Sequence, residues 1–231
     1  MVRRSGSRIA CLSIAGRKAT VRAARLELLR TMASSPGKSV RRRSGDRFDQ
    51  LLDVADRQIN DERSAAISMH AIGEAAGVSR ALVYAYFADQ YRLLDAVLER
   101  HLDWLRAAGI EEAARHGGAL ERLVACAVLY LHHVVAHGSA LELVLRETDV
   151  ARQLNGAVGR FRARLHRHLV RAVRAELSMT AHEAMVLILL LAVIPAESGR
   201  LANEGRMTSA EALELTARLV QASFDALRPY P

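Results

Sequence analysis

The segment SMHAIGEAAGVSRALVYAYF (residues 68–87) constrains the fold of this chain more than any other stretch. Ser68 stands where a helix N-cap belongs, and the short helix that follows is expected to end at Gly77, which supplies a positive φ. Ser79 is a second N-cap candidate and opens another helix that runs through the end of the segment. Gly73 is small where the two helices must cross. Two short helices joined at one glycine form a helix-turn-helix pattern.

The apolar spacing in this segment predicts which faces are buried. A small shared core is expected from Ile72, Ala76, Val78, Val83 and Phe87. The second helix then turns Arg80, Ala81, Leu82 and Tyr84 outward. Between Ala75 and Ala88 there is no acid, one arginine and two tyrosines. Glycine turns and aromatic packing also occur in ordinary helical bundles, but the complete pattern favours a helix whose exposed N-terminal half enters a DNA major groove.

The rest of the chain shows helical periodicity and no strand-like alternation. Helices are expected over Asp46–Ile59, Gln90 to about Ala108, Ala119–His137, Ser139 to about Leu154, about Val158–Leu177, Thr180–Gly199 and Ser209–Leu227. Asp89, Thr180 and Ser209 or Thr208 are the expected N-caps, and Pro195 is expected to kink or end its helix. The sequence therefore predicts an all-α fold with about nine helices.

Positive charge is concentrated at the N-terminus. Residues 1–45 hold twelve Lys or Arg and one acid, a net charge of +11, whereas residues 46–231 have a net charge of −3. Such an arm is typical of a disordered segment that binds a polyanion. Met32 opens MASSPGKSVRRRSGDRF, which makes a normal beginning, so the true start is expected there; the Arg-rich first thirty residues also resemble a transit peptide in composition.

Several classes of protein find no support in the sequence. Cys11 and Cys126 lie too far apart to indicate a disulfide framework, which favours a cytoplasmic setting. The longest apolar run, Ala184–Ala196, is shorter than the ~20 residues of a membrane-spanning helix. His133 and His137 have a metal-compatible spacing, yet no further ligand pattern accompanies them, so no metal site is predicted. No catalytic motif or cofactor motif is present.

The region Leu51–Leu98 resembles the N-terminal domain of the TetR/AcrR family of bacterial repressors, with its most specific part at Ser68–Leu94. The resemblance implies a helix-turn-helix DNA-binding domain at residues 46–90, an effector-binding and dimerisation domain at residues 91–231, and no catalysis. It also implies dimerisation through the last two helices. The expected function is a repressor that binds a palindromic operator as a homodimer and is released by a small hydrophobic or amphipathic effector.

The resemblance also implies roles for individual residues. Ser68 and Ser79 would cap onto phosphates, Arg80, Ala81 and Leu82 would approach base edges, and Tyr84 and Tyr86 would contact base or backbone. The family pattern is not kept everywhere: Arg63 replaces a turn glycine, Leu82 replaces a threonine, and Gln90 replaces a phosphate-contacting lysine. Residues 46–104 hold six Arg against eleven acids, so the arm residues Lys38, Arg41, Arg42 and Arg43 are expected to supply phosphate or minor-groove contacts.

Contacts to the effector are expected from polar-tipped or aromatic side chains between the C-terminal helices. The candidates are Trp104, Cys126, Tyr130, His133, His137 and Phe161. Two alternatives remain open at this point. One is a helix-turn-helix DNA-binding protein without a small-molecule effector, and the other is a basic-arm protein that targets membranes or RNA.

Overall fold

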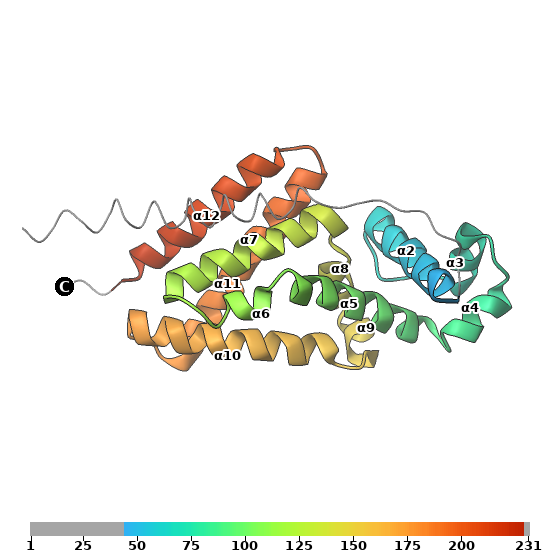
Figure 1. Cartoon of the computed structure of the whole chain (residues 1–231), viewed down its shortest axis with the longest axis horizontal. Coiled ribbons are helices and arrows are strands. Elements are labelled where there is room, and N and C mark those ends of the chain that lie inside the picture. Colours follow the sequence, from blue (N-terminus) through green and yellow to red (C-terminus); the bar gives the residue numbers. More distant parts are fainter. Residues whose placement is uncertain (1–43, 229–231) are drawn as a thin grey trace, which may run out of the picture. The chain divides into compact units, whose positions relative to one another are not determined.

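The computed structural model describes residues 44–228, and every regular element among them is an α-helix. The helices, labelled as in Figure 1, are α2 (Ser44–Glu62), α3 (Met69–Ala76), α4 (Arg80–Tyr86), α5 (Gln90–Ala107), α6 (Ile110–Ala113), α7 (Ala119–His137), α8 (Ala140–Arg146), α9 (Thr148–Gln153), α10 (Ala157–Leu177), α11 (Ala181–Asn203) and α12 (Ser209–Ala226). The all-α prediction is confirmed. The described part holds eleven helices, two more than the nine expected, because α6 was not anticipated and one expected helix is divided into α8 and α9.

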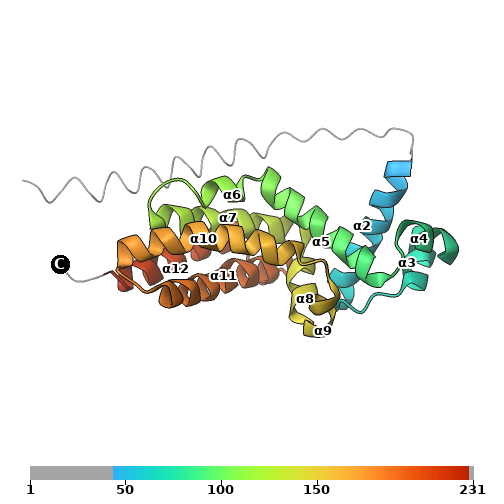
Figure 2. The ribbon, with the colours of Figure 1, turned by 90° about the horizontal axis from the view of Figure 1, so that it is seen from below.

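Helices α2, α3 and α4 pack into a small head (Figures 1 and 2). Ile72 and Val83 are fully buried between them, and Phe87 is almost so. A Cβ atom on Gly73 would lie 3.1 Å from the carbonyl oxygen of Val78 and 3.3 Å from Val83 Cγ2, closer than ordinary van der Waals contact. The two short helices therefore cross at a distance that only glycine permits without a shift of its neighbours.

Helices α3 and α4 begin after the predicted N-caps and α3 ends at the predicted glycine, whereas α2 extends beyond the expected Asp46–Ile59 at both ends. The Ser68 hydroxyl accepts a hydrogen bond from the Ala71 amide at 3.5 Å, and the Ser79 hydroxyl accepts one from the Leu82 amide at 3.2 Å. Gly77 ends α3 in the left-handed region, at φ 66°. These local signals confirm the expected helix-turn-helix geometry.

The turn after α2 keeps a left-handed residue even though the sequence has Arg63 there. Arg63 adopts φ 54°, a conformation that costs a non-glycine residue about 1 kcal/mol. Its guanidinium lies 2.9 Å from a carboxylate oxygen of Glu204, at the end of α11. The turn thus has the shape that a glycine would give, and the arginine side chain gains an ion pair to a distant helix.

Behind the head, α7, α10, α11 and α12 form a helical body, and α5 leads from the head into it (Figure 2). The largest core cluster of the body includes Leu123, Val173, Leu191 and Phe224. A Cβ atom on Gly199 would lie 2.6 Å from Val134 Cγ1, so α11 and α7 also meet at a glycine.

Two expectations about the body helices are wrong. The single helix predicted from Ser139 to about Leu154 is split into α8 and α9 at Glu147, whose φ is −80° and ψ 88°. The Glu147 carboxylate there accepts hydrogen bonds from the Ala65 amide at 2.7 Å and the Ser64 hydroxyl at 3.1 Å. Of the two effects expected of Pro195, a kink or an end of its helix, the structure contradicts the end: α11 continues to Asn203, past the expected Gly199, and has buried residues on both sides of the proline.

The expectation that no segment is suited to cross a membrane also needs correction. Within the described residues, α7 and α11 are long and apolar enough to do so by length and composition alone. The two helices pack along each other in the body, and Leu131 and Val134 of α7 are buried there. Burial in the core of the body accounts for much of the apolar character of α7 and α11.

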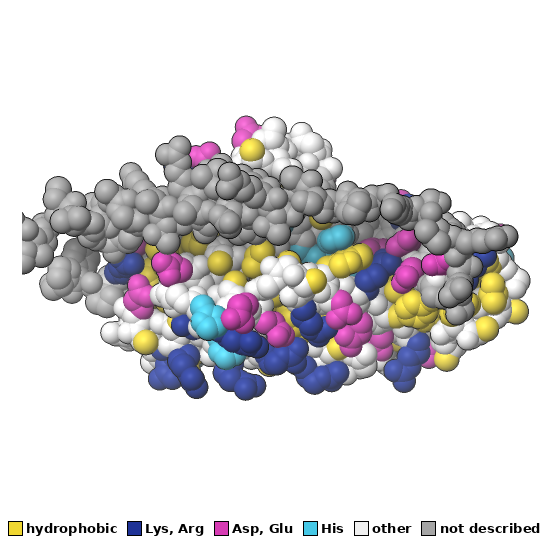
Figure 3. Space-filling model, in the orientation of Figure 1, with side chains coloured by type: hydrophobic (Ala, Val, Ile, Leu, Met, Phe, Trp, Pro, Cys, Tyr) yellow, Lys and Arg dark blue, Asp and Glu magenta, His cyan; other side chains and the backbone are white. Residues whose placement is uncertain are grey.

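The basic residues of α10 form a solvent-exposed face. Arg160, Arg164, Arg167, Arg171 and Arg174 recur at helical spacing and are all exposed. Figure 3 shows Lys and Arg side chains gathered along the edge of the molecule where α10 lies. Arg164 lies 3.1 Å from Glu111.

Candidate nucleic-acid interface

The exposed face of α4 carries the side chains expected to meet DNA. Arg80, Ala81, Leu82 and Tyr84 are all exposed, with 37% of Leu82 and 40% of Tyr84 accessible. The Arg80 guanidinium lies 5.3 Å from the centre of the Tyr84 ring and donates a hydrogen bond to its hydroxyl at 3.4 Å. The face is therefore polar and cationic, and α4 itself contains no carboxylate.

The other expected DNA contacts surround this face. Ser68 and Ser79 are exposed; their hydroxyl oxygens cap α3 and α4, which leaves each O–H free to donate. Tyr86 is half-buried, with its ring centre 6.4 Å from that of Phe48 and 6.5 Å from that of Phe87. Gln90, the first residue of α5, is also half-buried. The four predicted arm contacts, Lys38, Arg41, Arg42 and Arg43, lie outside the described residues.

The six residues expected to contact an effector fall into separate places. Trp104 of α5 and His137 of α7 stack face to face, with ring centres 3.8 Å apart and an interplanar angle of 10°. His133 lies one turn before His137, and Tyr130 packs against it at 6.1 Å. The structure thus brings four of the six together.

Cys126 and Phe161 are not part of that group. The Cys126 thiol lies 3.8 Å from the carbonyl oxygen of Ile110, to which it donates, and burial raises its pKa to about 12, which keeps it protonated. Phe161 is 3% exposed, beneath the guanidinium groups of Arg106 and Arg164. Both side chains serve the packing of the body in the structure.

A surface cleft of about 470 Å³ opens beside the Trp104–His137 stack. It lies between α2, α5 and the end of α7, and its lining includes Asp53, Asp56, Asn60 and Arg100. The cleft is therefore at the junction of head and body, and most of the residues that line it have polar or charged side chains.

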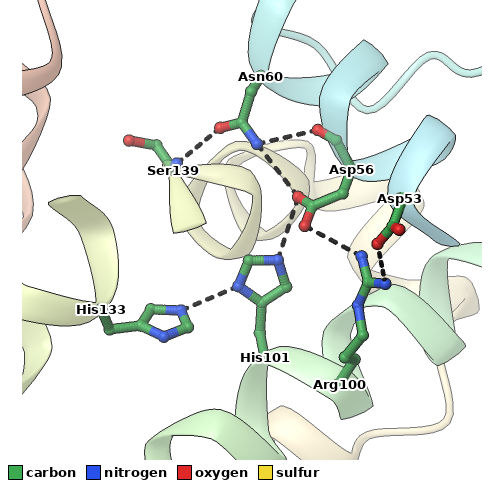
Figure 4. A network of polar contacts seen from close by, with 7 residues as sticks. All are labelled: Asp53, Asp56, Asn60, Arg100, His101, His133 and Ser139. Atoms are coloured by element: carbon green, nitrogen blue, oxygen red, sulfur yellow. Dashed lines mark hydrogen bonds and ion pairs between the residues drawn. The ribbon is translucent and has the colours of Figure 1, made fainter. Parts of the chain in front are cut away.

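Sequence reasoning missed a polar network beside this cleft, which shares Asp53, Asp56, Asn60 and Arg100 with the cleft lining (Figure 4). Asp56 of α2 accepts hydrogen bonds from Arg100 Nη2 at 3.2 Å and lies 3.2 Å from Nε2 of His101. The other ring nitrogen of His101 lies 2.9 Å from Nε2 of His133. The position of His101 could have indicated the network. It lies on the buried face of α5 with Leu98, Leu102 and Leu105, and a buried polar side chain requires hydrogen-bond partners.

His133 and Glu142, both in the body, have displaced pKa values. Burial, together with the nearby His101 and His137 rings, lowers the pKa of His133 to about 3, so it is neutral at physiological pH. Burial raises the pKa of Glu142 on α8 to about 7, although Arg146 and Arg162 oppose the shift. Oε2 of Glu142 is inaccessible to solvent and has no hydrogen-bond partner.

Helices α11 and α12 expose an apolar strip on the surface of the body. The strip consists of Val186, Leu189, Leu190, Val193, Leu215 and Leu219. Leu190 is 64% exposed and Val193 59%, and the spacing of Val186, Leu190 and Val193 places them on one face of α11. Isolated exposed apolar residues are common, but a set on two adjacent helices marks an interaction surface.

Comparison with known proteins identifies the head. Residues 51–97 match the family model described as bacterial regulatory proteins, tetR family. No curated protein sequence gives a match.

Solved structures share the fold over most of the chain. A TetR-like transcriptional regulator from Rhodococcus sp. RHA1 is 22% identical, with a TM-score of 0.62 over 80% of this chain and 99% of that chain. A putative TetR-family regulator from Rhodococcus sp. is 17% identical, with a TM-score of 0.61 over 78% and 99%. The transcriptional regulator FadR from Bacillus subtilis, in complex with stearoyl-CoA, is 14% identical, with a TM-score of 0.57 over 75% and 97%.

The structural likeness establishes the fold, and the match over residues 51–97 establishes what the head is for. A helix-turn-helix with a carboxylate-free α4 is built to contact DNA, and proteins of this kind regulate transcription without catalysing a reaction. Residues 51–97 are the part of the chain that matches the tetR family of bacterial regulatory proteins, the described residues share the fold of solved TetR-family regulators, and the chain is a DNA-binding transcriptional regulator.

Proposed function

We propose that this regulator is a ligand-responsive repressor that binds a palindromic operator as a homodimer and leaves it when a small hydrophobic or amphipathic effector binds. The observation that carries the proposal is the combination of a DNA-facing α4 with an exposed apolar strip on α11 and α12. The exposed face of α4 suits a DNA major groove, and the exposed apolar strip would be removed from water by an apolar partner surface.

The proposed DNA contacts divide by position on the head. Arg80, Ala81, Leu82 and Tyr84, on the exposed face of α4, would lie against base edges in the major groove. A set around that face would hold the phosphate backbone, namely Ser68, Ser79, Tyr86 and Gln90, together with the arm residues Lys38, Arg41, Arg42 and Arg43. Leu82 suits a thymine methyl group because its side chain has no hydrogen-bonding atom.

The proposed dimer follows from the apolar strip. A single chain would leave Leu190 and Val193 largely in water, whereas a second copy would cover them with the same residues across a two-fold axis. Two heads related by that axis would present their α4 helices to successive major grooves, about 34 Å apart. A palindromic operator is the DNA that such a dimer reads.

We assign residues 46–90 to DNA binding and residues 91–231 to effector binding and dimerisation. An effector that enters between the body helices would displace α5, which begins at the head with Gln90 and ends in the body at Ala107. The FadR protein named above was crystallised with stearoyl-CoA, an amphipathic molecule, in the same fold. A coupling of about 1–3 kcal/mol between effector and DNA, roughly 5–150-fold in affinity, would be enough for regulation.

Operator selection from a pool of random duplexes tests the proposal. The selected duplex and a scrambled duplex of the same length are then compared at one salt concentration, with the wild-type chain, with Tyr84→Ala and with the control Arg206→Ala, an exposed residue between α11 and α12. We expect a symmetric selected sequence, a loss of its preference in Tyr84→Ala and no loss in Arg206→Ala. Selection of no sequence, or preference that survives Tyr84→Ala, would contradict the proposal.

A further inference from the structure

A chain of buried hydrogen bonds links the head to the body through three helices. Asp56 of α2 is 8% exposed, His101 of α5 is fully buried, and His133 of α7 is 5% exposed. Figure 4 shows His101 between the other two, with one ring nitrogen toward Asp56 and the other toward His133. These residues come from separate segments of the sequence and meet only in the folded chain.

The donors and acceptors in this chain can be matched to one another. Oδ1 of Asp56 faces both Nε2 of His101, at 3.2 Å, and Nδ2 of Asn60, at 3.1 Å, while Oδ2 accepts from Arg100 at 3.2 Å. A carboxylate can only accept, so Nε2 of His101 must carry a hydrogen. The 2.9 Å contact between Nδ1 of His101 and Nε2 of His133 holds one further hydrogen, which either ring can supply.

A second tie joins α2 to the turn between α7 and α8. Asn60 Oδ1 accepts a hydrogen bond from the backbone amide of Ser139 at 2.7 Å, and its amide group also donates to the Asp56 carbonyl oxygen at 2.9 Å. The preceding residue, Gly138, has φ 78°, and a Cβ atom on it would lie 2.3 Å from Asn60 Oδ1. The absence of a side chain at Gly138 is what lets Asn60 reach the turn.

A metal ion is a poor alternative occupant for this site. Both ring nitrogens of His101 already face a protein partner, and the described residues hold no group of three His, Cys, Asp or Glu side chains arranged to bind a metal. The two ring nitrogens of His101 are therefore both occupied within the protein.

We infer that Asp56, His101, His133 and Asn60 are positioning residues for DNA binding, which fix the head on the body in the orientation that the operator requires. Apolar side chains can slide past one another, but buried hydrogen bonds are directional and are costly to leave unmade. The joint between α2, α5 and α7 thus has one preferred arrangement. The inference rests on the proposed dimer, because two heads reach the same operator only if each keeps its orientation.

The inference also gives α5 and α7 a defined role in regulation. His101 and Trp104 lie on α5 and His133 and His137 on α7, so a shift between these two helices would separate the rings that join them. An effector that moves α5 relative to α7 must then break the His101–His133 hydrogen bond. The head would lose its fixed orientation without any effector contact to the head itself.

Two substitutions of His133 separate positioning from packing. His133→Leu fills the same space but removes the bond to His101, whereas His133→Gln places an amide group near the position of Nε2 and can restore it. Gly138→Ala interferes with the Asn60 tie from the opposite side. The control is Val173→Ala, a fully buried residue of α10 in the separate core cluster of the body, which lowers stability without touching the joint.

The measurement is the affinity of each full-length chain for the selected operator and for a scrambled duplex, at a temperature where circular dichroism shows every variant folded. We expect His133→Leu and Gly138→Ala to lower operator affinity about tenfold, as for the loss of one buried hydrogen bond, with scrambled-duplex affinity unchanged. His133→Gln should stay within about twofold of wild type, and Val173→Ala should match wild type.

One result would contradict the positioning role of the network, and a different result would contradict the proposed operator binding. Operator affinity of His133→Leu equal to that of Val173→Ala would overturn the inference and leave the network a role in stability alone. A wild-type chain that binds both duplexes equally would instead overturn the operator proposal, which the wild-type measurement shows before any variant is compared.

Discussion

The indole ring of Trp104 lies parallel to the imidazole ring of His137 at 3.8 Å, across the joint between α5 and α7. Trp104 is the single tryptophan of the chain, so its fluorescence reports on this joint without added labels. The two helices that the stack connects are the ones that would separate when an effector binds.

The stack predicts a fluorescence change at acid pH. Burial, with a further contribution from His101, holds the pKa of His137 below its usual 6.5. The ring is therefore predominantly neutral at pH 7, and the midpoint at which it becomes an imidazolium that could quench the stacked indole lies below pH 6.5. We expect Trp104 emission to fall as the pH is lowered, with a midpoint below pH 6.5. The same titration of His137→Gln should be flat, and a fall centred above pH 6.5 in the wild type would contradict the assignment.

A pair of glycine substitutions tests the crossing of α3 and α4. Gly73→Ala places a Cβ atom 3.1 Å from a backbone oxygen, so we expect a loss of about 1–3 kcal/mol in the free energy of unfolding. Gly159→Ala, in the exposed part of α10, meets nothing within 4 Å and should gain about 0.5–1 kcal/mol from helix propensity. Urea unfolding of the two variants measures both changes. Equal stability of Gly73→Ala and wild type would mean that the helices separate at no cost.

The buried carboxyl of Glu142 predicts how stability depends on pH. Its pKa is about 7 in the folded chain and near 4.5 when unfolded, so the folded chain holds a proton in this window that the unfolded chain has released. The free energy of unfolding therefore falls as the pH rises from 4.5 to 7, by about 2–3 kcal/mol for this group. Glu142→Gln should be more stable than wild type by about that amount at pH 8, with little difference at pH 4.5.

Thermal or urea unfolding at the two pH values measures the Glu142 effect. Glu214→Gln, an exposed position on α12, is the control and should show the same stability difference at both. A gain for Glu142→Gln that is as large at pH 4.5 as at pH 8 would show that the carboxyl group is not the source.

The apolar strip predicts the oligomeric state. Leu190→Glu combined with Val193→Glu places two charges where a second copy would pack, so we expect a monomer in sedimentation velocity and a weaker operator complex. Both residues are mostly exposed in the single chain, and helix content should be unchanged. Ala163→Glu, on the exposed side of α10, is the control and should remain a dimer. A double variant that sediments like wild type would place the dimer interface elsewhere.

Much of the fold was predictable because its signals are local. N-caps such as Ser68, Ser79 and Thr180 act within four residues, and the structure places all three where the sequence indicated. The bounds of α7, Ala119–His137, were predicted from glycines on either side. At these positions the side chain or the glycine acts on the backbone within its own turn, so the local sequence is enough to predict the structure.

The errors occur where distant residues decide the local structure. Glu147 interrupts the expected helix because its carboxylate binds the loop after α2, and Pro195 stays within a helix because the surrounding core holds it. The network at the head–body joint was missed for the same reason. Asp56 and His101 are unremarkable in sequence, and only their placement together reveals that each satisfies the other.

The charge of the head has a consequence for how this regulator searches DNA. Residues 46–104 carry eleven acids against six arginines, yet α4 carries none of those acids. An acidic surface is repelled by the phosphate backbone, so we expect encounters that begin on a face of the head other than that of α4 to be short. Sustained attachment to random sequence is then expected to depend on the basic residues 1–45, which carry a net charge of +11. Added salt shortens the range of this repulsion, so a moderate rise in ionic strength lengthens unproductive encounters as well as weakening specific ones.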